Sequence, residues 1–196
     1  MDYVITASPS LNNLLTTNEL SKRPSRPPDF EAVNQAFVSL LTAGLRSPES
    51  ILQRYAELLL PLCDAHSSGV SILEIANGEE IFRWHAIAGR YAAYRWGTMP
   101  RYASPCGVIL HTKGAQLFKY PDRHFPYSIP LSPPICEALL TPFQINGEDV
   151  IGTTWVIAHE QNRKFDYEDL RRMQTFARFT SISYDLAVKD KDKRGL

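Results

Sequence analysis

The sequence has no long hydrophobic run and no excess of charge of either sign. Its longest nearly uninterrupted apolar stretch is residues 58–62, where a proline interrupts the leucines, whereas a membrane-spanning helix needs about 20 apolar residues. Lysine plus arginine and aspartate plus glutamate are equal at 21 each, so no net charge attracts the chain to nucleic acid or an acidic membrane. We therefore expect neither a membrane nor a nucleic acid as a partner.

Cysteine is also scarce. Cys63, Cys106 and Cys136 make an odd count of three, which does not support a disulfide framework. The first residues, MDYVITASPS, lack the basic start and apolar stretch of a secretion signal. We therefore expect reduced thiols and a cytoplasmic location.

Motifs for metal and phosphate chemistry are missing too. The five histidines are scattered and form neither an HExxH nor a CxxC pattern, although a metal site needs ligands at fixed spacing. No glycine-rich phosphate loop is present. We expect no metal cofactor and no catalytic activity.

The composition that remains is 44% hydrophobic over 196 residues, enough for one buried core with tails. Residues 1–29 are polar and rich in proline, and we predict a flexible leader there. Residues 30–187 form the predicted single domain. Residues 188–196 form a charged tail that we expect to be solvated and frayed.

The hydrophobic pattern predicts helix, helix, hairpin, long connection, hairpin, helix. Apolar residues three to four apart favour helices over 30–44 and 48–63, and Asp166 with Asp169 caps a closing helix. Turns at 77–78 and 146–147, both Asn-Gly, join two pairs of strands. The order predicts an α+β domain: a central antiparallel sheet with helices on one face and the long irregular connection, which includes a helix over 104–113, on the other.

Several motifs together resemble GAF domains of the type attached to bacterial sensor histidine kinases. They are 48–74 (PESILQRYAELLLPLCDAHSSGVSILE), 82–86 (FRWHA), 104–107 (SPCG), 123–127 (RHFPY), 133–135 (PPI), 137–143 (EALLTPF), 152–159 (GTTWVIAH) and 163–169 (RKFDYED). The resemblance covers roughly residues 48–187. It implies a GAF-like fold and a sensor or regulatory domain in signal transduction, which binds a small ligand. Its output would lie on a separate signalling protein or elsewhere in the natural protein.

The long connection and the neighbouring strand contain the candidate ligand-binding residues. Aromatic and basic side chains suit a pocket for a small molecule, because they combine apolar walls with a few hydrogen-bond donors. The candidates are Trp84, His85, Arg101, Cys106, His111, Arg123, His124, Phe125 and Tyr127. In the alternative, these side chains fill the pocket and the chain is purely a dimerisation or protein-interaction module.

Cys106 follows Ser104 and Pro105, a typical helix start. A cysteine in the first turn has a lowered pKa and sits near an anion site, unless it packs as a small hydrophobic residue. Families resembling phytochrome attach a bilin to a cysteine near the position of His124 here, so we expect no covalent bilin. The GAF family of free methionine sulfoxide reductases stays a remote alternative, because Trp96 and Leu131 stand where its other cysteines would be.

The closing helix has a wide apolar face, and the helix over 30–44 has an apolar stripe of its own. In GAF proteins the first and last helices often pair across a two-fold axis. We therefore expect a homodimer, in which the interface residues are Phe37, Phe176, Phe179, Ile182 and Leu186; in the alternative, both helices pack on their own sheet and leave a monomer.

Overall fold

The computed structural model describes residues 10–44, 46–126, 130–145 and 149–194, and its centre is a six-stranded antiparallel sheet. The strand order is β3-β2-β1-β6-β5-β4. The strands are β1 (Ser67–Ala76), β2 (Glu79–Gly89), β3 (Thr98–Pro100), β4 (Gln116–Lys119), β5 (Glu137–Ile145) and β6 (Asp149–Ala158). The predicted α+β class with an antiparallel sheet is confirmed, and two short strands within the connection, β3 and β4, extend the sheet at both edges.

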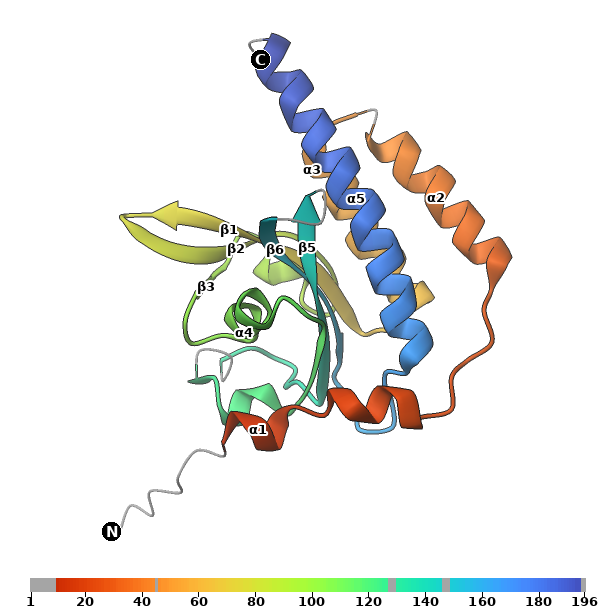
Figure 1. Ribbon diagram of the computed structural model, residues 1–196, viewed down its shortest axis with the longest axis vertical. Coiled ribbons are helices and arrows are strands. Elements are labelled where there is room, and N and C mark those ends of the chain that lie inside the picture. The colour runs from red at the N-terminus through yellow and green to blue at the C-terminus, as the bar shows by residue number, and fades with distance from the viewer. Residues whose placement is uncertain (1–9, 45, 127–129, 146–148, 195–196) are drawn as a thin grey trace.

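Two helices, α3 (Pro48–Leu62) and α5 (Tyr167–Arg194), pack on one face of this sheet, and α2 (Phe30–Gly44) packs on both of them from outside. Figure 1 shows them side by side, with the C-terminal part of α5 extending beyond the sheet. The other face carries the connection, in which α4 (Pro105–Thr112) lies against the strands. Each face has its own hydrophobic core, so the sheet separates a helix-side core from a connection-side core.

The helix ends follow their sequence signals. Ser47 accepts a hydrogen bond from the backbone N–H of Ser50 and precedes Pro48 at the first helical position. Asp166 and Asp169 each accept the other's backbone N–H at 2.9 Å, a reciprocal cap that starts α5. No helix in the described ranges combines the length and hydropathy that crossing a bilayer requires.

The first hairpin turn is also confirmed. Asn77 and Gly78 both adopt positive φ, 52° and 82°, the pair of left-handed conformations that a tight turn between twisted strands requires. The second predicted turn, at 146–147, lies outside the described residues, but β5 and β6 on either side of it pair in antiparallel register.

The N-terminal segment differs from the predicted flexible leader over residues 10–28. It contains a short helix, α1 (Leu11–Leu14), and a 3-10 helix, η1 (Thr17–Lys22), and it buries Leu14 and Leu20. The backbone N–H of Thr16 donates to the carbonyl oxygen of Leu117 on β4 at 2.8 Å. Leu14 and Leu20 do not form a helical pattern of apolar residues, so the sequence did not predict this packing.

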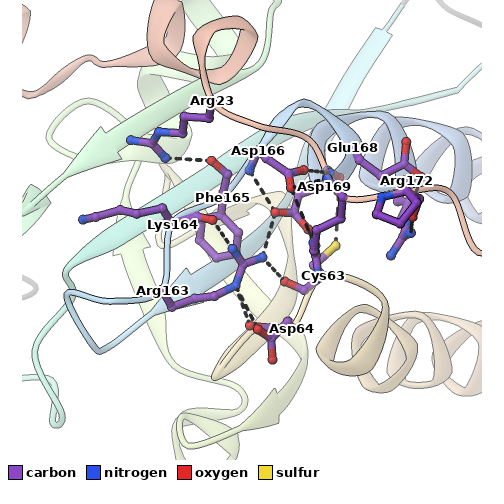
Figure 2. A network of polar contacts seen from close by, with 12 residues as sticks. Arg23, Cys63, Asp64, Arg163, Lys164, Phe165, Asp166, Glu168, Asp169 and Arg172 are labelled. Atoms are coloured by element: carbon purple, nitrogen blue, oxygen red, sulfur yellow. Dashed lines mark hydrogen bonds and ion pairs between the residues drawn. The ribbon is translucent and has the colours of Figure 1, made fainter.

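Ion pairs hold the end of this segment to the base of α5. Arg23 contacts both carboxylate oxygens of Glu137 at 3.0 Å and donates to the carbonyl oxygen of Phe165 at 2.7 Å. Arg26 pairs with Asp166 and Asp169. Figure 2 shows Arg23 meeting Phe165 next to the aspartates that cap α5. The segment is therefore tied to both the sheet and the last helix.

The apolar faces of α2 and α5 meet within the chain, which corrects part of the predicted dimer interface. The ring of Phe37 lies 4.5 Å from that of Phe176 and 5.3 Å from that of Phe179. Phe176 is buried, so it is not available to a second chain. Ile182 and Leu186 of the predicted set remain exposed.

Candidate functional site

A cavity of about 40 Å3 lies on the connection side of the sheet. Its floor comes from residues of β2, β5 and β6, which alternate along β5 and β6 but not along β2: Trp84, Ile87, Ala138, Leu140, Trp155 and Ile157. Its cover comes from the connection, including Met99, Cys106 and Leu131. The cavity wall contains no charged side chain among the described residues.

A β-bulge turns Trp84 toward this cavity. In the pairing of β1 with β2, Val70 faces Ala86 and Ser71 faces Trp84, so His85 is the extra residue. On one side of the bulge Trp84 belongs to the connection-side core, and on the other side Ala86 belongs to the helix-side core. Without the extra residue, these two side chains would lie on the same face.

Trp155 forms the other large aromatic part of the floor. Its indole lies across Gly69 of β1, where an added Cβ would stand 2.3 Å from Cζ2 of the ring. Its indole N–H donates to Oγ of Ser71 at 2.9 Å. The absence of a side chain at Gly69 therefore allows Trp155 to lie flat against the sheet.

The indole N–H of Trp84 differs from that of Trp155. The side chain is only 7% exposed, and its Nε1 is buried with no hydrogen-bond partner among the described residues. A buried donor without an acceptor is unfavourable by about 1–3 kcal/mol. Trp84 therefore contributes apolar ring surface to the cavity, while its N–H stays buried and unpaired.

Cys106 lies in the cover as a protonated thiol. Ser104 caps α4 by accepting the N–H of Gly107 at 3.2 Å, as the sequence predicted. The thiol is buried, and Oγ1 of Thr153 donates to its sulfur at 2.9 Å. Burial raises the pKa of Cys106 to about 11, and the Thr153 hydrogen bond only partly opposes that rise. The structure therefore supports the interpretation of Cys106 as a small packed residue, and not the interpretation in which its pKa is lowered.

The other predicted ligand-binding residues do not converge on the cavity. His85 pairs with Glu74 at 2.5 Å, and Arg101 lies 3.2 Å from Glu80. His111 is exposed on α4, and the guanidinium of Arg123 stacks over the ring of Tyr120. His85, Arg101 and Arg123 each contact a nearby residue instead, and spacing in the sequence alone does not reveal these contacts.

The aromatic residues near position 125 seal the connection-side core. Phe125 is buried and packs against Phe118, with ring centroids 6.2 Å apart. The ring of His124 stands edge-on to Phe125 at 4.8 Å. Tyr127 lies outside the described residues. The sequence did not indicate that Tyr91, Met99 and Trp155 line the cavity. Only Trp155 had a usable signal, because it alternates with Thr153 and Ile157 along one strand.

Ser67 and His159 form a buried pair with the geometry of a nucleophile and its base. Nε2 of His159 lies 2.8 Å from Oγ of Ser67, and Nδ1 lies 2.9 Å from the carbonyl oxygen of Pro134. Because that carbonyl can only accept, Nδ1 carries the proton and Nε2 accepts from the serine. Ser67 is fully buried and also accepts the N–H of Tyr91. The pair therefore links strands and the connection without access for a substrate.

The described residues contain no group of three or more His, Cys, Asp or Glu side chains that could hold a metal ion. All three cysteines are buried and unpaired. Burial raises the pKa of Cys63 to about 12, as it raises that of Cys106.

Comparison with known proteins identifies the family. The GAF domain family matches residues 47–184, and the chain therefore belongs to it. No curated protein matches significantly.

Solved structures share the fold at low identity. The GAF domain of an Acinetobacter phosphoenolpyruvate-protein phosphotransferase is 10% identical with a TM-score of 0.67, over 83% of this chain and 96% of that one. The photosensory core module of a Stigmatella aurantiaca phytochrome is 12% identical with a TM-score of 0.68, over 88% of this chain but only 40% of that one.

An enzyme shares the fold as well. The type II free methionine-R-sulfoxide reductase from Thermoplasma acidophilum is 14% identical with a TM-score of 0.56, over 71% of this chain and 94% of that one. GAF domains are in general regulatory domains that sense small ligands.

Proposed function

We propose that this chain is a non-catalytic, cytoplasmic sensor domain that binds a small molecule in the cavity between the sheet and the connection, and signals through its terminal helices. The observation that carries the proposal is the cavity itself, which has two tryptophans, Trp84 and Trp155, in its floor. Binding sites for small molecules are typically such apolar hollows with few polar groups.

The absence of catalysis is supported by the thiols. The thiolate is the reactive form of cysteine, and a pKa of about 11 at Cys106 leaves roughly one thiolate in ten thousand near neutral pH. The family resemblance places Trp96 and a position close to Leu131 where the other reductase cysteines would be, and Leu131 lines the cavity.

Strand β6 supports a route from the cavity to the helices. Trp155 faces the cavity, while its neighbour Thr154 faces α3, with its Oγ1 3.0 Å from the hydroxyl of Tyr55. That hydroxyl is also 3.4 Å from the carbonyl oxygen of Met173 on α5. A shift of β6 on ligand binding would therefore reach α5 through one buried tyrosine.

A homodimer through α2 and α5 completes the proposal. Large apolar side chains remain exposed on both helices: Val38, Leu41, Ile182 and Leu186. Exposed apolar area is unfavourable by about 25 cal/mol per Å2, and a two-fold axis lets one such surface cover another copy of itself. The output would then reach a separate signalling protein or an attached module.

A second candidate function is a dimerisation module whose pocket is filled. The small volume of the cavity favours it, together with Phe125, which seals the same core. Native mass spectrometry of freshly purified protein, first intact and then denatured, separates the two functions. A dimer that carries a small added mass, lost on denaturation, supports the sensor function. A dimer without added mass under all conditions supports the dimerisation module. A covalent adduct or a monomer contradicts the proposal.

A further inference from the structure

A groove of about 580 Å3 lies where α5 runs alongside β5 (Figure 1). It is open to solvent, it shares no lining residue with the cavity between the sheet and the connection, and that cavity has only about 40 Å3. Its walls come from α5, from the second half of β5 and from the segment that joins α4 to β4. The lining residues that matter here are Lys113, Pro142, Gln144, Gln174, Arg178 and Ile182.

The groove follows a stretch of β5 that β4 does not cover. Strand β4 pairs with β5 only as far as Leu140, whereas β5 continues to Ile145 with β6 as its one paired neighbour within the described ranges. Pro142 stands on this open stretch and has no backbone N–H to offer an added strand. Prolines at such positions protect sheet edges from strand addition. The groove is therefore suited to recognition by its side chains and not to the addition of a strand.

Two cationic side chains line the groove from different walls. Lys113 ends α4, Arg178 lies on α5, and both are exposed. Among the described residues, no aspartate or glutamate lines the groove, and neither cation takes part in an ion pair or a side-chain hydrogen bond. The next acidic residue along α5, Asp185, is already paired with Lys189 at 2.6 Å. Both positive charges are therefore available to an anionic ligand.

The rest of the lining favours a peptide over a nucleotide. No aromatic side chain lines the groove in the part of the chain that the structure describes, so nothing there can stack on a base. Gln144 and Gln174 supply amide groups for hydrogen bonds, and Pro142 and Ile182 supply apolar surface. The lining residues of α5 extend from Gln174 to Ile182. That length is about 12 Å along the helix axis, which matches about three to four residues of an extended peptide.

From these observations we propose that the groove between α5 and β5 binds an acidic peptide segment of a separate signalling protein. Its carboxylates pair with Lys113 and Arg178, and its apolar side chains contact Pro142 and Ile182. Because exposed ion pairs each contribute little and are screened by salt, the interaction is weak and reversible. The inference goes beyond the proposed sensor function, since it depends on neither the ligand cavity nor the dimer. Ile182 lies where the groove borders the proposed dimer surface.

Two short peptides test the inference. Both have about six residues, enough to span the groove. In one peptide glutamate and leucine alternate, and in the other glutamine replaces each glutamate, so that only the charge differs. The full chain, labelled with 15N, is titrated with each peptide and with inorganic phosphate while its amide signals are followed by NMR.

Three variants each remove one positive charge. Lys113→Gln and Arg178→Gln change the groove. Lys22→Gln is the matched control, because Lys22 is also exposed and has no ion pair among the described residues, but it lies outside the groove.

We expect the glutamate peptide to shift the backbone signals of Gly114 and Ala115, which also line the groove, and the side-chain amide signals of Gln144 and Gln174. Lys113→Gln and Arg178→Gln should each weaken binding about threefold to fivefold, the size of one exposed ion pair, and the glutamine peptide should bind about tenfold more weakly. Added salt should also weaken binding. Lys22→Gln should leave the affinity nearly unchanged.

Three results would overturn the inference. The first is an absence of shifts at the groove residues of the unmutated chain, a readout that does not depend on the folding of any variant. The second is equal weakening by Lys22→Gln and Arg178→Gln, which would show non-specific attraction between charges. The third is phosphate binding in the groove as tightly as the glutamate peptide, which would show a site for small anions.

Failure of this inference can be told apart from failure of the proposed function. Leu186→Glu, the variant that should abolish the proposed dimer, should bind the glutamate peptide as the unmutated chain does. An empty ligand cavity or a monomeric chain would contradict the sensor function and leave the groove as a peptide site. An unoccupied groove would leave the sensor function standing.

Discussion

Replacing Arg23 by alanine should release the N-terminal segment and destabilise the whole domain. The Arg23 side chain is 15% exposed, and it pairs through two nitrogens with Glu137, whose side chain is fully buried. Arg23→Ala leaves that carboxylate without its bidentate partner. It also removes the contacts to Glu19 and to the carbonyl oxygen of Phe165.

The expected loss of stability depends on the contacts that the Glu137 carboxylate keeps in the Arg23→Ala variant. Breaking a buried ion pair by removing one partner typically costs about 3–5 kcal/mol. Here Nζ of Lys164 remains 3.2 Å from the carboxylate, and the N–H of Phe165 still donates to it at 3.2 Å. We therefore expect a loss of about 2–3 kcal/mol, which corresponds to a fall in melting temperature of about 5–10 °C for a chain of this length.

Thermal unfolding followed by circular dichroism measures this loss, with Arg90→Ala as the control. Arg90 pairs with Glu160 at 2.5 Å, but both side chains are about half exposed, and such surface pairs contribute at most about 1 kcal/mol. Both variants remove one positive charge. Hydrogen exchange should show faster exchange over residues 10–28 only for Arg23→Ala. Equal melting temperatures for the two variants would refute the idea that Arg23 anchors the segment.

Four further predictions concern the helices, the thiol, the buried histidine and the link between the two cores. Leu186→Glu should convert the dimer to a monomer, because it places a charge in the proposed seam; light scattering checks this, and a monomeric unmutated chain at tens of micromolar would remove the basis for it. Cys106→Ser should leave fold and ligand binding nearly intact, and steady reduction of free methionine sulfoxide that this variant loses would show an enzyme instead. Burial lowers the pKa of His159, so below about pH 6.5 the unfolded state binds more protons than the folded state. Stability should therefore fall as the pH falls from about 6.5 through the folded pKa; urea unfolding across that range measures the slope, and an unchanged slope in His159→Gln would contradict this cause. Tyr55→Phe should cost about 1 kcal/mol of stability and leave ligand affinity within about twofold, while the ligand's effect on dimerisation weakens; an unchanged effect would exclude this route.

Local signals in the sequence were sufficient to predict where two helices begin and where the first hairpin turns. Ser47 with Pro48, Asp166 with Asp169, and Asn77 with Gly78 determine the backbone through contacts only a few residues apart, so the caps and the first turn could be predicted. Strands β3 and β4 have three and four residues, too few for a periodic pattern. The anchoring of Arg23 joins residues 114 positions apart, and no spacing rule indicates such a pair.

The candidate site was predictable only in part, for a related reason. Trp84 and Cys106 were identified from an aromatic strand and a capped helix, and both line the cavity. Arg101 and Arg123 attracted the prediction because charged groups suggest ligand recognition, but each is occupied by a neighbour, Glu80 and the ring of Tyr120. The sequence shows which residues can form hydrogen bonds, but not which of them are left unpaired after folding.

The single extra residue at His85 has consequences for both cores. Because the bulge reverses the alternation along β2, Trp84 faces the cavity while Ala86 and Ala88 face the helices. The small alanines leave room for α3, which packs closely on β2, and the large indole fills the cavity side. A regular strand would place a tryptophan under the helices or alanines in the floor of the cavity. The bulge therefore allows one strand to support a tight helix layer and an aromatic binding surface at the same time, and a ligand that moves Trp84 acts on a strand that already contacts the helices.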